Sequence, residues 1–345
     1  MRQAGVPYFE DAPRAEALRF CAESNLPAAL DTYGNLFVRL NRAPRQRPVV
    51  LTAHLDHPGF TVERRLGPRR FMLQFNGGVA DPYFRQGARV RLQPGNVPAR
   101  LVRALRGDTR QFEFEARRIA GEEPKFAVWD LEDFALRQVR FHGRACDDLI
   151  GCAAVLATLR ELQRRRAEVN VIGLLSRAEE VGFQGALTVA AEGRLPKDAL
   201  VISLETSKQL PGVRMGQGVI VRVGDKASIF DSTASRFLTE VAGELARRRK
   251  GFSFQRALMA GGTCEATAYQ EFGYRSAAVC VALGNYHNSG PRARIAVEFV
   301  SVQDVVGMVD LLVAAAQAMP RYGVVTGKLP QRLQGLLNEA RKRLS

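Results

Sequence analysis

The chain has 345 residues, enough for about two domains, and 46% of them are apolar, so it can bury a substantial core. Charged residues make up 25% and aromatic residues 8%, which excludes a wholly disordered chain. The net charge of +15 is the unusual value. The basic clusters are scattered, without zinc-finger spacing or interleaved aromatic residues, so we do not expect a nucleic-acid partner.

The cysteines and the apolar stretches point to a cytoplasmic protein. Five cysteines form an odd set without zinc-finger spacing, as expected for reduced thiols in a cytosol. The segment Met1 to Pro13 lacks the apolar core of a signal peptide. The most apolar predicted helix, near Met308 to Met319, is interrupted by Asp310 and Gln317 and falls short of the ~20 apolar residues that a membrane span needs. We therefore expect no membrane association.

The predicted elements divide the chain into an α/β part and a β-rich part. A helix is expected at 11–24 and strands at 36–40 and 49–53. From 62 to 139, short apolar runs broken by glycine and proline predict a small β-barrel, with a β-sandwich as the alternative. Beyond residue 144, helices and strands alternate as follows: helix 149–164, strand 169–175, helix 184–192, strand 199–204, helix 232–249, strands 252–258 and 276–281, helix 302–319.

This order predicts one α/β domain with a mixed, mainly parallel sheet flanked by helices. Residues 1–61 and 140–345 would form that domain, and residues 62–139 would be an inserted β domain. The tail, 330–345, reads as a basic amphipathic helix that we expect to pack on the body through its leucines.

Candidate metal ligands lie just past predicted strands or at a helix start. They are His54-Leu55-Asp56, Asp147-Asp148, Glu179-Glu180, Glu205 and His287. Each is a weak signal alone, because a His-x-Asp match is more often a surface turn and paired aspartates usually cap a helix. One carboxylate, however, can bridge two cations, and one of two adjacent glutamates can bind metal while its neighbour transfers protons.

The set is more informative than its members. Open α/β sheets bind ligands at the carboxyl ends of their strands, where these side chains are expected. Imidazoles and carboxylates without thiolates suit two divalent ions, zinc first and cobalt or manganese as alternatives. The chain has only four histidines, and this site would use two of them.

These motifs resemble those of the tetrahedral aminopeptidases, dinuclear zinc exopeptidases that include glutamyl, leucyl and lysyl aminopeptidases. The resemblance covers most of residues 1–320 and depends on motifs in a fixed order. They are Asp31-Thr32-Tyr33-Gly34-Asn35-Leu36, Ala53 to Phe60, Asp147-Asp148, Glu179 to Ala186, Gly261-Gly262-Thr263 and Tyr286-His287. That family also carries an inserted β domain between its His-x-Asp and Asp-Asp motifs.

The resemblance implies a role for each candidate. One metal would be held by His54, Asp147 and Glu205, and the other by Asp147, Glu180 and His287. Asp56 would orient His54, and Glu179 would be the catalytic acid/base. A cis peptide bond between Asp147 and Asp148 is also implied.

The chain departs from the family pattern at four positions. Glu205 stands where aspartate is usual, His57 where an acidic residue is usual, Leu149 where arginine is usual and Cys264 where aspartate is usual. Related dinuclear hydrolases accept glutamate at the first position, so Glu205 is kept as a ligand. Glu265 is a candidate to replace the aspartate missing at Cys264. These changes bear on substrate preference and assembly more than on chemistry.

The predicted function is hydrolysis of the N-terminal peptide bond of peptides by a dinuclear zinc aminopeptidase. The resemblance also implies a homo-oligomer, a dimer or a dodecamer, with the inserted domain serving assembly or substrate access. Two alternatives stay open: a dinuclear amidohydrolase or deacylase acting on N-acyl amino acids, and a non-catalytic relic. The preferred N-terminal residue does not follow from the sequence.

Overall fold

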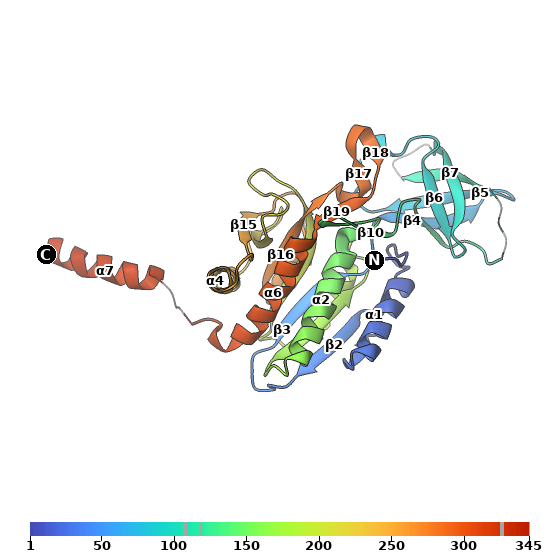
Figure 1. Cartoon of the computed structure of the whole chain (residues 1–345). Helices are drawn as coiled ribbons and strands as arrows, with labels where there is room; N and C mark the ends of the chain where they lie inside the picture. Colours follow the sequence, from blue (N-terminus) through green and yellow to red (C-terminus); the bar gives the residue numbers. More distant parts are fainter. Residues whose placement is uncertain (106–109, 118, 120, 325–327, 345) are drawn as a thin grey trace.

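The computed structural model describes residues 1–345 except 106–109, 118, 120, 325–327 and 345. Most of the chain forms a large mixed sheet with helices on both faces, and a β-barrel adjoins it (Figure 1). The predicted fold class, an α/β sheet with an inserted barrel, is confirmed.

The sheet has eleven strands. Its main path runs β1 (Ala28–Leu30), β2 (Leu36–Asn41), β12 (Asn170–Ser176), β3 (Val49–His54), β13 (Leu200–Lys208), β16 (Arg275–Gly284), β19 (Glu298–Ser301), β11 (Arg140–Gly143) and β10 (Phe134–Arg137), with β14 (Val219–Gly224) and β15 (Phe254–Leu258) branching from β16. The four central strands β12, β3, β13 and β16 are parallel, whereas their flanking neighbours pair antiparallel to them. The carboxyl ends of the parallel strands therefore lie at one edge of the sheet.

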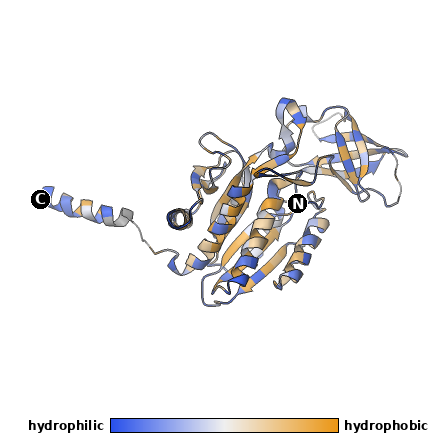
Figure 2. Ribbon diagram, in the orientation of Figure 1, coloured by the Kyte–Doolittle hydropathy of each residue, from blue (hydrophilic) through white to orange (hydrophobic). Residues whose placement is uncertain are grey.

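Helices cover both faces of this sheet. Against one face pack α1 (Asp11–Glu23), α2 (Cys146–Arg164), α4 (Ser232–Arg248) and α6 (Val302–Ala318), and against the other pack α3 (Gln184–Ala191) and α5 (Glu265–Glu271). Successive side chains of a strand point to opposite faces. Leu51 therefore packs in the core beneath α2 and α6, and Val50 packs in the core beneath α3 and α5. Apolar residues accordingly run along the central strands (Figure 2).

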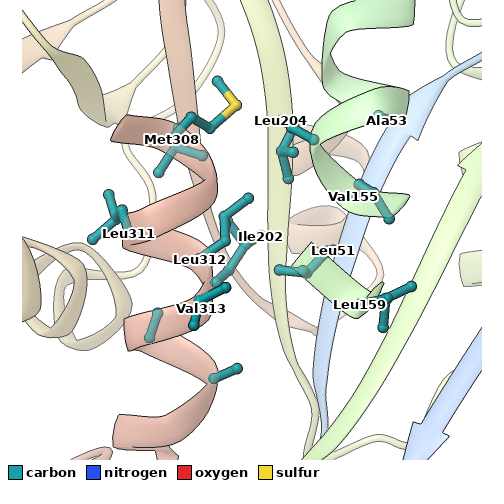
Figure 3. Close-up of a cluster of buried hydrophobic side chains, with 14 of the residues drawn as sticks. Leu51, Ala53, Val155, Leu159, Ile202, Leu204, Met308, Leu311, Leu312 and Val313 are labelled. Atoms are coloured by element: carbon teal, nitrogen blue, oxygen red, sulfur yellow. The ribbon is translucent and has the colours of Figure 1, made fainter. Parts of the chain in front are cut away.

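The larger core lies between β3 and β13 on one side and α2 and α6 on the other. Figure 3 shows Leu51 and Ile202 from the strands facing Leu159 of α2 and Leu312 of α6. Each side chain is fully or almost fully buried, and burial of such an aliphatic side chain contributes roughly 1.5–3 kcal/mol. This core fixes α2, and hence Asp147 at its start, relative to the strand ends.

Helix α6 is the most apolar helix. The stretch Val302–Arg321 is long and apolar enough to cross a membrane by length and composition alone, but 56% of its apolar window is buried in the fold. It packs against α2, α4 and β16. Its apolar character is therefore that of a core helix.

The barrel is closed by six antiparallel strands. In barrel order they are β4 (Gly59–Arg65), β5 (Arg70–Asn76), β8 (Gln111–Ala116), β7 (Val97–Ala104), β6 (Arg89–Gln93) and β9 (Phe126–Trp129). Phe60 lies at the centre of its core, with its ring centroid 4.9 Å from that of Trp129 and 5.1 Å from that of Phe114. Strand β10, which falls within the segment 62–139, pairs with β11 in the large sheet instead.

The remaining elements of the described chain are four 3-10 helices, two short strands and the C-terminal helix. They are η1 (Asp81–Tyr83), η2 (Tyr286–Asn288), η3 (Pro291–Ala293), η4 (Met319–Arg321), β17 (Ser289–Gly290), β18 (Arg294–Ile295) and α7 (Lys328–Arg343).

The tail does not pack on the body as predicted from its leucines. Helix α7 forms but projects away from the body (Figure 1). Leu333, Leu336 and Leu337 of this helix are 43–54% exposed, and Leu344 just beyond it is 87% exposed. The main body of the fold therefore does not cover these leucine side chains.

Candidate metal centre

The candidate ligands meet at the carboxyl edge of the parallel strands. His54 is the last residue of β3 and pairs in register with Ser176, the last residue of β12. Glu179 and Glu180 follow β12 directly, and Glu205 lies near the end of β13. Asp147 enters at the start of α2 and His287 within η2. Residues far apart in the sequence are thus brought to one site by parallel strand pairing.

Asp147 lies between the two histidines. Its Oδ1 is 3.5 Å from His54 Nε2, and its Oδ2 is 3.5 Å from His287 Nε2. The two oxygens therefore face two different imidazoles, the arrangement expected of a carboxylate that bridges two cations.

The ligand atoms fall into two groups. His54, Glu179 and Glu205 form one, and Asp147, Glu180 and His287 form the other; the ligand atoms of each group lie within 4.8 Å of one another. From His54 Nε2, Glu205 Oε2 is 4.0 Å away and Glu179 Oε2 is 3.8 Å away. From His287 Nε2, Glu180 Oε1 is 3.3 Å away.

These spacings fit a metal ion better than direct hydrogen bonds. Hydrogen bonds between such atoms are about 2.7–3.2 Å long, whereas two ligands about 2.0–2.1 Å from one tetrahedral zinc ion lie roughly 3.4 Å apart. Three buried carboxylate oxygens, Asp147 Oδ1, Glu180 Oε1 and Glu205 Oε1, have no hydrogen-bond partner. Since unpartnered buried oxygens are costly, the donor set suits divalent cations.

The outer nitrogen of each histidine is held by a backbone oxygen. His54 Nδ1 lies 3.1 Å from the oxygen of Asp56, and His287 Nδ1 lies 2.8 Å from the oxygen of Gly78. A proton on each Nδ1 leaves Nε2 free to bind metal. Gly78 belongs to the segment between β5 and β6, so this segment helps to orient a candidate ligand.

Asp56 lies beneath the paired glutamates. Its Oδ1 accepts the backbone N–H of Glu179 and its Oδ2 accepts that of Glu180, each at 3.0 Å. The same carboxylate is 3.5 Å from His54 Nδ1. It therefore lies next to His54, as the proposed orienting role requires, but its hydrogen bonds go to the glutamates.

The turn that carries the glutamates is held at both ends. Ala178 has a φ of 51° and Gly182 a φ of 106°, so the chain reverses sharply around Glu179 and Glu180. Before the turn, the Arg177 guanidinium pairs with the buried Glu10 carboxylate at 2.7 Å. This fixes where both carboxylates point.

Burial and crowding shift the ionisation of these groups. Burial, strengthened by neighbouring carboxylates, raises the pKa of Glu179 well above its usual value and that of Glu205 to about 8. Burial acts in the same direction on Asp147, but its interactions with the nearby imidazoles of His287 and His54 outweigh burial and lower its pKa. The excess of carboxylates over imidazoles leaves negative charge that bound cations would neutralise.

The positions that depart from the family pattern have structural roles. His57 Nδ1 lies 2.5 Å from the backbone oxygen of Asp147, and burial lowers the pKa of its ring to about 4. Leu149 is buried in the main core. Glu265 accepts a hydrogen bond from Thr52 at 2.7 Å and another from the Ser176 hydroxyl. It therefore links β3 to β12 beneath the site. The peptide bond between Asp147 and Asp148 is cis, as the resemblance implies.

A cleft opens beside the ligands, and the sequence analysis named only part of its lining. Besides the ligands, its walls include Phe183, Lys208, Arg222, Met259, Thr263 and Tyr286. Arg222 lies on β14, which was not predicted. The available signal was a single arginine within the apolar run Val219 to Val223. Glu298, whose Oε2 accepts the backbone N–H of Asp147 at 3.0 Å, was also missed because it lies 151 residues away.

Comparison with known proteins identifies the family. The model of the M42 glutamyl aminopeptidase family matches residues 115–311, more than half of the chain. The chain belongs to this family. The predicted resemblance to tetrahedral aminopeptidases is thereby confirmed, and M42 membership supports a metal-dependent aminopeptidase.

Solved structures share the fold of this M42 chain. The TET1 peptidase of Pyrococcus horikoshii has a TM-score of 0.75 at 19% identity, over 91% of this chain and 96% of that one. An aminopeptidase from the archaeon Desulfurococcus kamchatkensis has a TM-score of 0.76 at 19% identity, over 95% of each chain. An M18-family aminopeptidase from Thermotoga maritima has a TM-score of 0.69 at 13% identity, over 92% and 94%. At these identities the likeness concerns the fold.

Proposed function

We propose that this M42 chain is a dinuclear metal-dependent aminopeptidase that hydrolyses the N-terminal peptide bond of peptides. The observation that carries the proposal is the position of Asp147, whose two oxygens face His54 and His287 at 3.5 Å each. One metal is assigned to His54, Asp147 and Glu205, and the other to Asp147, Glu180 and His287. Zinc fits this set, and cobalt and manganese accept the same ligands.

The residues around this site suit amide hydrolysis. Two divalent ions bound there would lower the pKa of a water molecule and polarise the scissile carbonyl. Glu179 is assigned as the general base that accepts a proton from the attacking water and then donates it to the departing amine. Burial raises the pKa of its carboxyl group well above the ordinary value, so that its affinity for a proton is greater than that of an exposed glutamate. Asp56 holds its backbone in place.

Separate replacement of Glu179 and of Glu180 distinguishes a catalytic role from a role in metal binding. We expect E179Q to keep two equivalents of zinc and to lose most of its turnover, by at least about 10²-fold. E180Q should instead lose metal, because it removes a ligand. Metal content by mass spectrometry and turnover of aminoacyl anilides would be measured together. Normal activity of E179Q would show that another group is the base.

Metal removal tests the ligand set as a whole. A chelator should abolish activity and lower the melting temperature, because ions that bind only the folded state stabilise it. Added zinc, cobalt or manganese should restore both. A protein that binds no divalent metal tightly would favour the non-catalytic alternative.

The rival enzymatic function is deacylation of N-acyl amino acids with a similar metal site. A panel of aminoacyl anilides and N-acyl amino acids distinguishes the two, since an aminopeptidase requires a free α-amino group. The M42 family match favours the aminopeptidase.

We also propose a cytoplasmic homo-oligomer in which the β-barrel, as a separate domain inserted at residues 62–139, contributes to assembly. The P. horikoshii TET1 peptidase can assemble into a tetrahedron or a large octahedral shell. The five cysteines of this chain are buried and free, which suits a reducing compartment. Light scattering on the purified protein should give a mass near that of two or twelve chains, and a monomer would contradict the proposal.

A further inference from the structure

The two histidines of the candidate metal centre are supported from different parts of the chain. His54 Nδ1 lies 3.1 Å from the backbone oxygen of Asp56, only 2 residues further along the chain. His287 Nδ1 lies 2.8 Å from the backbone oxygen of Gly78, which is 209 positions away. Gly78 follows β5, a strand of the barrel. The inserted segment therefore reaches the metal centre on the side of the ion assigned to His287.

The contact between Gly78 and the imidazole of His287 is close. A Cβ atom added at Gly78 would lie 3.5 Å from Nδ1 of that ring. The preceding residue, Gly77, has a φ of 117°, and a Cβ atom there would lie 2.7 Å from the Cβ of Pro58. The chain therefore needs glycine at position 77 to follow this path. A proton on Nδ1 lets the Gly78 oxygen accept its hydrogen bond and hold Nε2 towards the other ligands.

Arg110 holds the backbone on either side of Gly78. Its Nη1 donates a hydrogen bond to the backbone oxygen of Gly77 at 3.2 Å, and its Nη2 donates one to the backbone oxygen of Val79. A guanidinium is planar and presents its donors in fixed directions, so it can hold two carbonyl groups at once. This pair of contacts fixes where the carbonyl of Gly78 points.

The barrel in turn fixes Arg110. Its guanidinium carbon lies 5.3 Å from the ring centroid of Phe75 and 5.1 Å from that of Phe84, within the range of a cation–π interaction. The backbone oxygen of Arg110 accepts the N–H of Phe75 at 3.0 Å. Phe75 belongs to the barrel core. Contacts thus lead from this core through one arginine to the carbonyl that meets His287.

The chain that follows His287 contacts the same part of the barrel segment. The Tyr83 hydroxyl donates a hydrogen bond to the backbone oxygen of Gly290, and the Arg85 guanidinium donates one to the backbone oxygen of Arg292, each at 3.0 Å. Strands β17 and β18 accordingly lie beside the barrel (Figure 1). The ligand is held to the barrel both by its own ring and by the residues after it.

We propose that Arg110 is a positioning residue for the metal centre, which fixes the carbonyl of Gly78 and through it the imidazole of His287, so that the inserted barrel completes one of the two metal sites. The inference rests on the dinuclear centre of the proposed function. The ion assigned to His287 depends on the barrel, whereas the ion assigned to His54 is supported within its own segment.

Stepwise metal affinities test this difference between the two ions. R110M removes the donors but keeps an apolar side chain that can pack on the two phenylalanine rings. We expect the wild type to bind two equivalents of zinc, and R110M to bind one of them about tenfold more weakly, at the lower end of the range for residues that support metal ligands. Competition with a chelator measures both affinities. R110K, which can reach one carbonyl, should recover part of the loss.

Two further variants complete the comparison. H287A should retain one ion, and the affinity of that ion should be the one that R110M leaves unchanged. R100M is the matched control, because Arg100 is an exposed arginine on β7 of the same barrel. It should bind both ions as the wild type does.

Hydrogen exchange in the unaltered protein gives an independent test. Zinc should slow the exchange of the backbone amides in the segment 77–85, although none of its residues is assigned as a ligand, because an ion on His287 stabilises the contact with Gly78. In H287A, zinc should leave the exchange of this segment unchanged.

The outcomes separate the inference from the proposed function. Affinities in R110M equal to those of the wild type, equal weakening of both ions, or exchange in 77–85 that zinc does not alter would each overturn the inference. Two tightly bound ions without any turnover of peptides would contradict the proposed function and leave the role of Arg110 standing. If R110M does not fold, R110K and the exchange measurement still decide.

Discussion

Asp56 Oδ1 accepts the backbone N–H of Glu179 at 3.0 Å, across 123 positions of sequence. Oδ2 of the same carboxylate accepts the next backbone N–H, that of Glu180, at the same distance. The side chain that was expected to orient His54 thus also fixes the backbone of the proposed base and of a proposed metal ligand.

Replacement of this carboxylate should disturb both functions. D56N presents an amide N–H to one of the two backbone N–H groups, so one hydrogen bond is replaced by a donor–donor clash. We expect metal affinity and kcat each to fall about 10–100-fold, the range typical of residues that support metal ligands. The measurements are zinc affinity by competition with a chelator and turnover at saturating metal. D198N, at an exposed position, is the control; if both variants behave alike, Asp56 has no such role.

Truncation of Phe60 should unfold the barrel before the sheet. Its ring contacts those of Phe75, Phe114 and Trp129 in the barrel core, and Phe→Ala changes in cores cost about 3–5 kcal/mol. Trp129 is the only tryptophan of the chain and lies in this core, so its fluorescence reports on the barrel. In F60A we expect the fluorescence transition in denaturant to precede the transition in far-ultraviolet circular dichroism.

Coincident transitions in F60A would argue against a separate barrel domain. L66A provides the control, because Leu66 is 40% exposed and its truncation should leave both transitions close to those of the wild type.

Loss of Asp133 should destabilise the protein in a pH-dependent way. Its carboxylate accepts hydrogen bonds from Arg91 at 2.6 Å and from the buried Arg144 at 3.2 Å. D133N leaves Arg144 without its ion-pair partner, and we expect a loss of about 2–3 kcal/mol, below the full cost for a buried pair because Asp133 is partly exposed. E123Q, in an exposed pair with Arg65, should lose less than about 1 kcal/mol.

The pH dependence follows from the ionisation of Asp133. Burial opposes its charge, but hydrogen bonds from Arg91 and the charge of Arg144 outweigh burial and lower its pKa below the ordinary 3.8. A group with a lowered pKa in the folded state stabilises the protein above its unfolded pKa and loses that contribution as pH falls through the folded value. The difference between wild type and D133N, measured by urea unfolding, should therefore be constant above about pH 5 and shrink below about pH 4. A difference that grows on acidification would contradict this account.

Deletion of the tail should leave the body intact. Leu333, Leu336 and Leu337 of α7 are exposed, so they contribute little burial energy. A chain ending at residue 324 should keep its melting temperature within about 2 °C and its activity within twofold, as surface changes cost less than about 0.5 kcal/mol. Loss of oligomers on deletion would instead assign α7 to assembly.

The amino-acid sequence alone determined most of the longer helices and strands and indicated the candidate ligands. Apolar periodicity located the strand that ends at His54 and the helix that begins near Asp147, because burial on one or both faces leaves a pattern in the sequence. The order of the motifs was enough to indicate the family. Short elements such as β14 were not predicted, because a run of a few apolar residues shows no distinctive periodicity.

Only the tertiary structure decided how the ligands face one another and what supports them. The Asp147 oxygens divide between two histidines because α2 packs on the strands that carry His54, and η2 brings His287 to the same edge. Contacts such as Asp56 with Glu179 and Gly78 with His287 join segments more than a hundred residues apart. They leave no local signature, since each residue alone would be an ordinary loop residue. The same holds for Arg222, which joins the cleft wall only because β14 pairs with β16 in the folded sheet.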